Sequence, residues 1–191
     1  PNLPDNVIAV HPPMIMPINF LPKGSLYNTL HRWDNEVVFK TIQKVVDDYQ
    51  LDNYIYLNCF NPFVGGVLPV RFKPLLNIYQ CIDDMEQEVY TAKHWAKLEE
   101  KVISDADIAF VTSRQLRNLK LPFNPNTYIL HNAVDETIFK RSISERHPRP
   151  VEMQEITTPI IGFTGNMDAS RMDYQLLKTI AEAHQDKTLV L

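Results

Sequence analysis

Two pairs of polar residues stand directly after short apolar runs of this sequence, where they could do chemistry. Asp83 and Asp84 follow one run, and His131 and Asn132 follow another. A carboxylate in such a turn can act as a general base or hold a substrate hydroxyl. A solvated turn or a helix N-cap would use the same aspartates, and the residues alone favour this structural interpretation of Asp83 and Asp84. Because adjacent side chains on a turn seldom converge, we expect at most one of the two to face a ligand.

His131 is open to two interpretations. Its imidazole could contact a ligand or donate a hydrogen bond to a backbone carbonyl, and a lone histidine is more often structural. The six histidines of the chain are scattered and lack the spacing typical of metal ligands. The sequence therefore predicts no metal site.

A third set of candidate residues belongs to the apolar run at 159–163 and the turn after it. Gly162 and Gly165 could let backbone N–H groups approach a phosphate closely, and a nearby helix N-terminus would favour the negative charge. Any tight turn from a strand into a helix also favours glycine. The spacing of the two glycines therefore leaves both the phosphate site and the simple turn open.

Apolar runs alternate with helical periodicities along the chain, which predicts an α/β fold. The runs are continuously apolar, so we expect a mostly parallel, Rossmann-like sheet with helices on both faces. Ser113 is the expected N-cap of a short helix whose Leu116 points inward. The expected strands cover residues 54–57, 75–79, 107–111, 127–130, 159–163 and 188–191. The other expected helices cover a segment that begins near Ser25, residues 92–104 and residues 173–184.

The segment 140–158 is charged and contains two prolines, which is typical of an interdomain linker. We therefore expect a partial N-terminal Rossmann-like domain in residues 1–139, a linker in 140–158 and the first βαβ unit of a second domain in 159–191. Ligands of open α/β sheets bind at the carboxyl ends of the strands, which is where the polar residues named above stand. The chain begins without methionine and ends inside an expected strand, so we expect a fragment of a longer protein.

Composition and charge narrow the function classes. The 191 residues carry a formal net charge of −4, without the basic excess of nucleic-acid binders, so no nucleic-acid partner is expected. No apolar run could span a bilayer and the N-terminus lacks the layout of a signal peptide, which favours the cytoplasm. Cys59 and Cys81 lack redox or metal spacing and are predicted to be buried free thiols. The basic residues between Lys140 and Arg149 predict a solvated linker, with contact to the inner face of an acidic membrane as the alternative.

Four segments, all within the chain from about Leu75 onward, together resemble GT-B glycosyltransferases. Residues 98–113 (LEEKVISDADIAFVTS) resemble the family segment in which a glutamate precedes an Ala-Asp pair, a strand and a serine. Residues 128–139 (YILHNAVDETIF) resemble the segment in which Pro-Asn-Gly-Val-Asp follows a strand. Residues 160–168 (IIGFTGNMD) are similar to the opening strand and loop of the donor-binding domain. Residues 79–86 (YQCIDDME) resemble a stretch of the bacterial members that act in teichuronic acid and other cell-surface polysaccharide synthesis.

This resemblance implies transfer of a sugar from a nucleotide-diphosphate donor to a glycan or a lipid-linked acceptor. In this family the N-terminal domain mainly holds the acceptor and the C-terminal domain the donor. The residues carried over by position to the donor diphosphate are Gly162, Gly165 and Asn166. The residues carried over to the acceptor side and the cleft are Asp83, Asp84, His131 and Asn132. No cofactor is implied, because the nucleotide sugar is itself the substrate, and no metal is implied, because this fold generally works without one.

The chain also departs from the family pattern. His131 stands where the family has proline and Ala133 where it has glycine, which leaves the geometry of this turn open. Family members use a basic residue for the diphosphate and an acidic E-x7-E segment for the sugar and ribose, and the chain carries neither. We therefore predict that this polypeptide alone is inactive. The alternatives are a nucleotide-sugar epimerase related to the GT-B fold and a Rossmann-like interaction module that binds no ligand.

Overall fold

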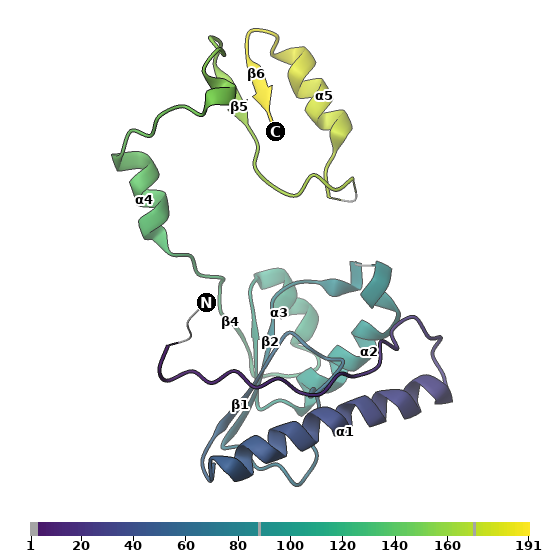
Figure 1. The fold of residues 1–191 in the computed structure, drawn as a ribbon. Coiled ribbons are helices and arrows are strands. Elements are labelled where there is room, and N and C mark those ends of the chain that lie inside the picture. Colours follow the sequence, from purple (N-terminus) through teal and green to yellow (C-terminus); the bar gives the residue numbers. More distant parts are fainter. Residues whose placement is uncertain (1–3, 88, 170) are drawn as a thin grey trace. The chain divides into compact units, whose positions relative to one another are not determined.

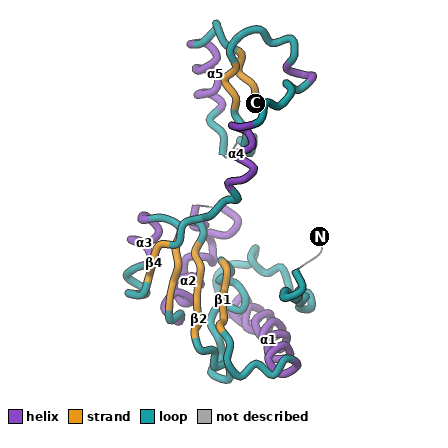
Figure 2. Tube along the Cα trace, turned by 90° about the vertical axis from the view of Figure 1, so that its left-hand side faces the viewer, coloured by secondary structure: helices purple, strands orange, loops and turns teal. Residues whose placement is uncertain are grey.

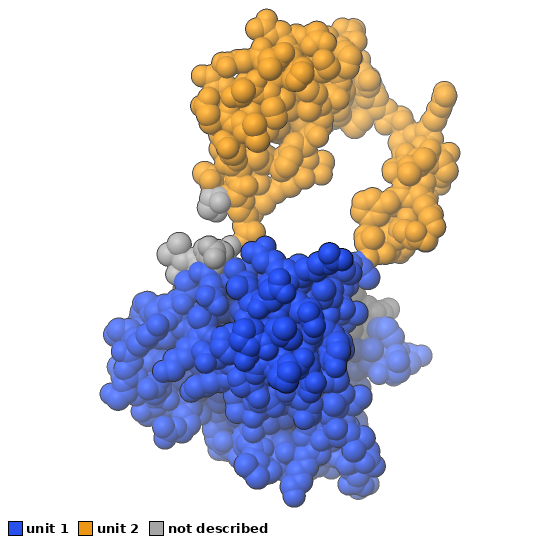
Figure 3. Space-filling model, turned by 180° about the vertical axis from the view of Figure 1, so that it is seen from behind, with its two compact units in different colours: residues 1–133 blue, residues 134–191 orange. Residues whose placement is uncertain are grey.

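The structure is a computed structural model that describes residues 4–87, 89–169 and 171–191. The chain forms two compact units, residues 1–133 and residues 134–191, which Figure 3 colours blue and orange. Unit 1 holds a four-stranded sheet and unit 2 a two-stranded sheet. No helix in the described ranges has the length and apolar character needed to cross a lipid bilayer.

The four strands of unit 1 are parallel and lie in the order β1-β2-β3-β4 (Figure 1). Their bounds are Ile55–Cys59 for β1, Leu76–Cys81 for β2, Ile108–Val111 for β3 and Thr127–Ile129 for β4. In the register, Asn58 pairs with Tyr79, Tyr79 with Ala109, and Ala109 with Thr127. Parallel neighbours need crossover connections, and here these carry helices between β2 and β3 and between β3 and β4. The predicted α/β class, a Rossmann-like parallel sheet flanked by helices, is confirmed.

The predicted helices of unit 1 are also present. Their bounds are Ser25–Asp48 for α1, Val89–Asp105 for α2 and Arg114–Lys120 for α3, with a short 3-10 helix η1 at Met85–Gln87. The predicted cap of α3 is confirmed, because the Ser113 hydroxyl accepts the amide of Leu116 at 3.1 Å and the Leu116 side chain is buried.

The helix α1 ends in a backbone motif that carries no glycine. Gln50 has a φ of 51°, and its amide donates to the carbonyl of Asp47 at 3.2 Å. The amide of Leu51 donates to the carbonyl of Val46 at 2.9 Å. Together these bonds form a Schellman motif, which satisfies carbonyls that the helix end would leave without partners.

The core of unit 1 lies between one face of the sheet and its helices. It consists of the buried side chains Tyr79, Cys81, Val102, Ile103, Ala106, Ala109, Val111 and Leu116. On the other face, Ile55, Leu57 and Tyr128 keep half or more of their surface exposed. Figure 2 shows this face in front of α2. The helices of unit 1 therefore cover the two faces unequally.

This unequal cover corrects one prediction about the cysteines. Both thiols are free, but only Cys81 is buried, and Cys59 is exposed. Cys59 belongs to the edge strand β1, in which Tyr56 and Asn58 point to the covered face and their neighbours point away. Cys59 was predicted to be buried, and that prediction is wrong because the face of β1 that carries it is left open.

Unit 2 contains the predicted βαβ arrangement. The strands β5, Ile160–Gly162, and β6, Thr188–Val190, are parallel and are joined by α5, Tyr174–Ala183. The segment expected as a linker holds the end of a further helix, α4, Glu136–Ser144, and a 3-10 helix η2, Val151–Met153. Asp135 caps α4, because its carboxylate accepts the amide of Thr137 at 3.0 Å. No described residue of α4 is buried.

Candidate functional site

Hydrogen bonds join the carboxyl ends of three strands in unit 1. The Thr112 hydroxyl, just after β3, donates to the carbonyl of Ile82, just after β2, at 2.7 Å. His131, after β4, bonds through Nδ1 to the carbonyl of Thr112 at 2.9 Å. The acidic turn, Thr112 and His131 therefore share one edge of the sheet, as the parallel topology requires. This edge is where open α/β sheets bind ligands.

Asp83 and Asp84 bind the backbone of their own turn. The Oδ1 atom of Asp83 accepts the amide of Asp84 at 2.8 Å, and Oδ1 of Asp84 accepts the amide of Glu86 at 3.3 Å. Asp83 is exposed and Asp84 is half-buried. These bonds give both aspartates a structural role. In the described part of the chain the second oxygen of each carboxylate is without a hydrogen-bond partner, and it could hold a hydroxyl group.

One ring nitrogen of His131 is hydrogen-bonded to the protein backbone. A carbonyl oxygen only accepts, so the bond to Thr112 requires a proton on Nδ1. In the neutral ring, Nε2 would then be an acceptor on an exposed side chain. Asn132 is also exposed, and its amide forms no hydrogen bond to another described residue. The two residues therefore present polar groups at the sheet edge.

A buried charged pair lies beneath this edge. Glu99 and Lys120 expose 1% and 6% of their side chains, and Lys120 Nζ lies 2.7 Å from Oε2 of Glu99. The Tyr79 hydroxyl donates to Oε1 of Glu99 at 2.8 Å. Burial lowers the pKa of Lys120, but the bond and the charge of Glu99 outweigh burial, so the net pKa is raised. Lys120 thus keeps its charge beside one carboxylate oxygen of Glu99, while the Tyr79 hydroxyl bonds the other.

Lys120 also connects this pair to the acidic turn. Its Nζ lies 3.6 Å from Oε1 of Glu86, whose side chain is half-exposed. Burial raises the pKa of the nearby Cys81 thiol, and the charge of Glu99 raises it further. Cys81 is therefore a protonated core thiol and not a nucleophile. Glu99, the first of the two glutamates in the segment 98–113, therefore has a structural role in this fold.

The glycine loop of unit 2 is exposed. A Cβ atom built at Gly162 would meet nothing within 4 Å, whereas one at Gly165 would lie 2.7 Å from Cζ of Phe163. The φ angles of both glycines lie outside the left-handed region. The side-chain oxygen of Asn166 accepts the amide of Asp168 at 2.9 Å and so closes the loop. Phe163 explains why residue 165 is a glycine, and nothing within unit 2 requires one at 162.

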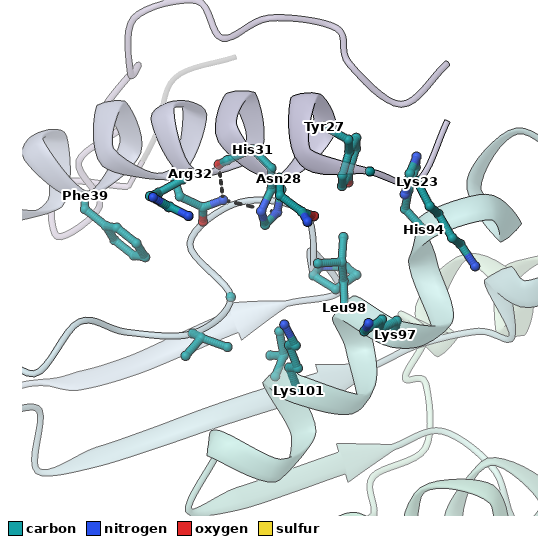
Figure 4. A pocket seen from close by; sticks show the side chains of 16 residues that line it. Lys23, Tyr27, Asn28, His31, Arg32, Phe39, His94, Lys97, Leu98 and Lys101 are labelled. Carbon is teal, nitrogen blue, oxygen red and sulfur yellow. Dashed lines mark hydrogen bonds between the residues drawn. The ribbon is translucent and has the colours of Figure 1, made fainter. Parts of the chain in front are cut away.

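One cavity of unit 1 was missed by the sequence analysis. It lies between α1 and α2, has a volume of about 740 Å³, and is lined by aromatic, basic and apolar side chains (Figure 4). Two basic residues one helical turn apart on α2, Lys97 and Lys101, border it, as do Tyr27 and His31 on α1. Both i,i+4 pairs are visible in the sequence, but only the pairing of the two helices brings them to one place.

The described residues contain no group of three or more histidine, cysteine, aspartate or glutamate side chains that could hold an ion.

Comparison of the chain with protein-family models, with curated proteins and with solved structures found no match.

Proposed function

We propose that this chain is part of a GT-B glycosyltransferase of the type that acts in bacterial cell-surface polysaccharide synthesis. The proposal rests on the order in which the elements of the fold follow one another along the chain. A parallel sheet with a polar carboxyl edge in unit 1 is followed, after α4 and η2, by a strand and a glycine loop in unit 2. The segments that resemble the family fall on these parts, namely α2 with β3, β4 with the cap of α4, and β5 with its loop.

In this proposal unit 2 contacts the donor. The diphosphate of a nucleotide sugar lies against the backbone near Gly162, Gly165 and Asn166. Three observations support this role: the loop is exposed, Gly162 has open space around it, and its glycines let the backbone approach an anion closely. Backbone N–H groups would stabilise the charge of the leaving nucleotide.

Unit 1 serves the acceptor, a glycan or a lipid-linked sugar. Asp83 or Asp84 would orient the acceptor hydroxyl with the carboxylate oxygen that the turn leaves unused, and His131 and Asn132 would line the cleft. A lipid-linked acceptor would place the protein in the cytoplasm at the inner membrane face. The exposed basic residues Arg146 and Arg149 would favour such contact.

Two other functions use the same parts differently. A nucleotide-sugar epimerase would change the sugar and keep it on the nucleotide, whereas a transferase releases the nucleotide. A turnover assay on a protein that carries the complete donor site separates these products. A Rossmann-like interaction module would form neither, and Asp83→Asn and Asp84→Asn would then change no activity.

Calorimetry with a series of UDP- and GDP-sugars tests the donor role on this chain. We expect a dissociation constant weaker than about 1 μM, because the chain lacks the family's basic residue and E-x7-E segment. Gly162→Ala should weaken binding further, since its methyl group would occupy the space of the diphosphate. Binding tighter than about 1 μM, or equal affinity for Gly162→Ala and the unchanged chain, would contradict this model of the donor site.

A further inference from the structure

The cavity between α1 and α2 has an aromatic floor and a basic rim. Tyr27 is 4% exposed and His94 is 5% exposed, and their rings stack with centroids 3.6 Å apart. His94 is fixed by a bond from Nε2 to the carbonyl of Leu21 at 2.9 Å. Figure 4 shows Tyr27 and His31 extending from α1 toward α2, with Lys97 and Lys101 on the opposing helix. The floor is therefore held in place before any ligand enters.

The charged side chains that line this cavity are all basic. Lys23, Arg32, Lys97 and Lys101 line it, and none of the described residues that line it is acidic. Within the described ranges, none of these four cations takes part in an ion pair or a hydrogen bond. The whole chain has a net charge of −4, so this positive field is local. Cations that face one cavity without counter-charges favour an anionic ligand.

Asp34 is the carboxylate whose charge affects Tyr27 in the floor, and it is not among the residues that line the cavity. Asp34 contributes to the raised pKa of Tyr27, which burial raises first, to about 12 in all. Asp34 is buried, and its Oδ1 atom accepts the amide of Met16 at 3.0 Å. The Tyr27 hydroxyl is therefore neutral and can only act as a hydrogen-bonding group.

That hydroxyl is without a partner. Among the described residues, the Tyr27 oxygen is buried and forms no hydrogen bond. Buried polar groups in folded proteins almost always bond to protein, water or a ligand. A ligand in this cavity, directly or through one water, would supply the missing partner.

We propose that the cavity between α1 and α2 binds a molecule through a phosphate or diphosphate group, which the cationic rim holds over the Tyr27–His94 floor. A volume of about 740 Å³ is within the range of small-molecule sites. Lysine binds phosphate as a mobile point charge, which suits a rim of long exposed side chains. The phosphate can belong to a soluble small molecule or to a lipid headgroup. The site does not depend on the donor loop of unit 2.

Calorimetry with inorganic pyrophosphate on the whole chain tests the site. The variant Lys97→Gln/Lys101→Gln removes two exposed cations of the rim, and we expect it to weaken binding about tenfold or more. The matched control Lys40→Gln/Lys73→Gln removes two exposed cations that do not line the cavity, and its affinity should stay within about twofold. Tyr27→Phe should weaken binding about threefold or more through loss of the hydroxyl. In a chain that already carries Gly162→Ala, Lys97→Gln/Lys101→Gln should still weaken pyrophosphate binding about tenfold or more, which separates this site from the donor loop.

A second arm distinguishes the source of the phosphate. Co-sedimentation with phosphatidylcholine vesicles that contain phosphatidylglycerol, with Lys97→Gln/Lys101→Gln as the comparison, detects a lipid headgroup. Binding of pyrophosphate alone supports a soluble ligand, and binding of vesicles that is lost in Lys97→Gln/Lys101→Gln supports a lipid. The proposal is overturned if neither probe binds, or if the rim variant and Lys40→Gln/Lys73→Gln lose affinity equally. Unchanged affinity in Tyr27→Phe would overturn the role of its hydroxyl.

Discussion

At the scale of single residues, the polar groups near the sheet edge divide into structural and available ones. Glu99 contacts Lys120 and accepts a hydrogen bond from Tyr79. Asp83 and Asp84 each accept a backbone amide with one carboxylate oxygen. The sequence could identify the aspartates as turn residues because Asp at a helix start is stabilising in its own right. It could not identify the partner of Glu99, because Lys120 lies on a different helix, and that contact exists only in the fold.

The first prediction concerns this buried pair. Glu99→Gln leaves the charge of Lys120 buried with only the half-exposed Glu86, at 3.6 Å, as a partner. We therefore expect a loss of about 3 kcal/mol in the free energy of unfolding, measured by urea denaturation. Adding Lys120→Met to this variant should recover part of the loss. Lys44→Gln breaks the exposed pair with Asp48 and should cost less than about 1 kcal/mol. Equal small losses in Glu99→Gln and Lys44→Gln would show that the buried pair is not charged.

The second prediction concerns the pH dependence of stability. Burial raises the pKa of Cys81, so the unfolded thiol ionises near pH 8.5 while the folded thiol keeps its proton. The stability that the protonated Cys81 thiol contributes is fully present below the pKa of the unfolded thiol and is lost as the pH rises above that pKa. Between about pH 8.5 and 9.5 the free energy of unfolding should fall with a slope of up to about 1.4 kcal/mol per pH unit.

Urea denaturation of two cysteine variants checks the source of this slope. Cys81→Ala should lower stability at all pH values because it leaves a small cavity, but it should flatten the slope. Cys59→Ala changes an exposed thiol and should keep the slope of the unchanged chain. A steep slope that persists in Cys81→Ala would assign the pH dependence to other groups.

At the scale of elements, the strands and helices could be predicted because each has its own pattern of apolar residues along the sequence. Ser113 marked the start of α3 through its capping hydroxyl. The end of α1 carries no such mark, since Gln50 takes the left-handed conformation that glycine usually takes. The exposure of Cys59 and the cavity between α1 and α2 could not be predicted, because both depend on which helix covers which face.

The third prediction concerns the loop that joins β1 to β2. A Cβ atom at Gly66 would lie 2.5 Å from Cγ2 of Val102 and 3.2 Å from the carbonyl oxygen of Pro62. Gly66→Ala should therefore push this loop away from α2 and cost about 1 to 3 kcal/mol in the free energy of unfolding. Gly24→Ala adds its Cβ in open space and should leave stability within about 0.5 kcal/mol. If Gly66→Ala were as stable as Gly24→Ala, the close packing of the loop on α2 would be wrong.

At the scale of the whole molecule, the two compact units divide at residues 133 and 134. The sequence placed a linker at 140–158 on the strength of charge and proline, whereas the structure has the helix α4 across part of that segment. The helix was missed because the charged residues and the two prolines of this segment favoured a linker. Residues 146–150 are exposed and lack regular secondary structure.

The fourth prediction follows from this exposed segment. Limited trypsin digestion should cut first after Arg146, because it is exposed in a stretch without regular secondary structure, whereas Arg149 precedes proline. Mass spectrometry should find residues 1–146 and 147–191 as the early products. Arg146→Gln should slow this cleavage. Early products that arise within α2 or β2, with Arg146 intact, would contradict the division into two units.

The fifth prediction addresses the proposed donor role, and backbone amide NMR of the labelled chain titrated with a UDP-sugar tests it most directly. We expect weak binding in which the amides of residues 162–168 shift together, and in which Gly162→Ala reduces those shifts. The open space at Gly162 and the exposure of this loop are the physical reasons. Shifts confined to unit 1, or no shift at residues 162–168 at saturating nucleotide sugar, would contradict the assignment of this loop to a glycosyltransferase donor site.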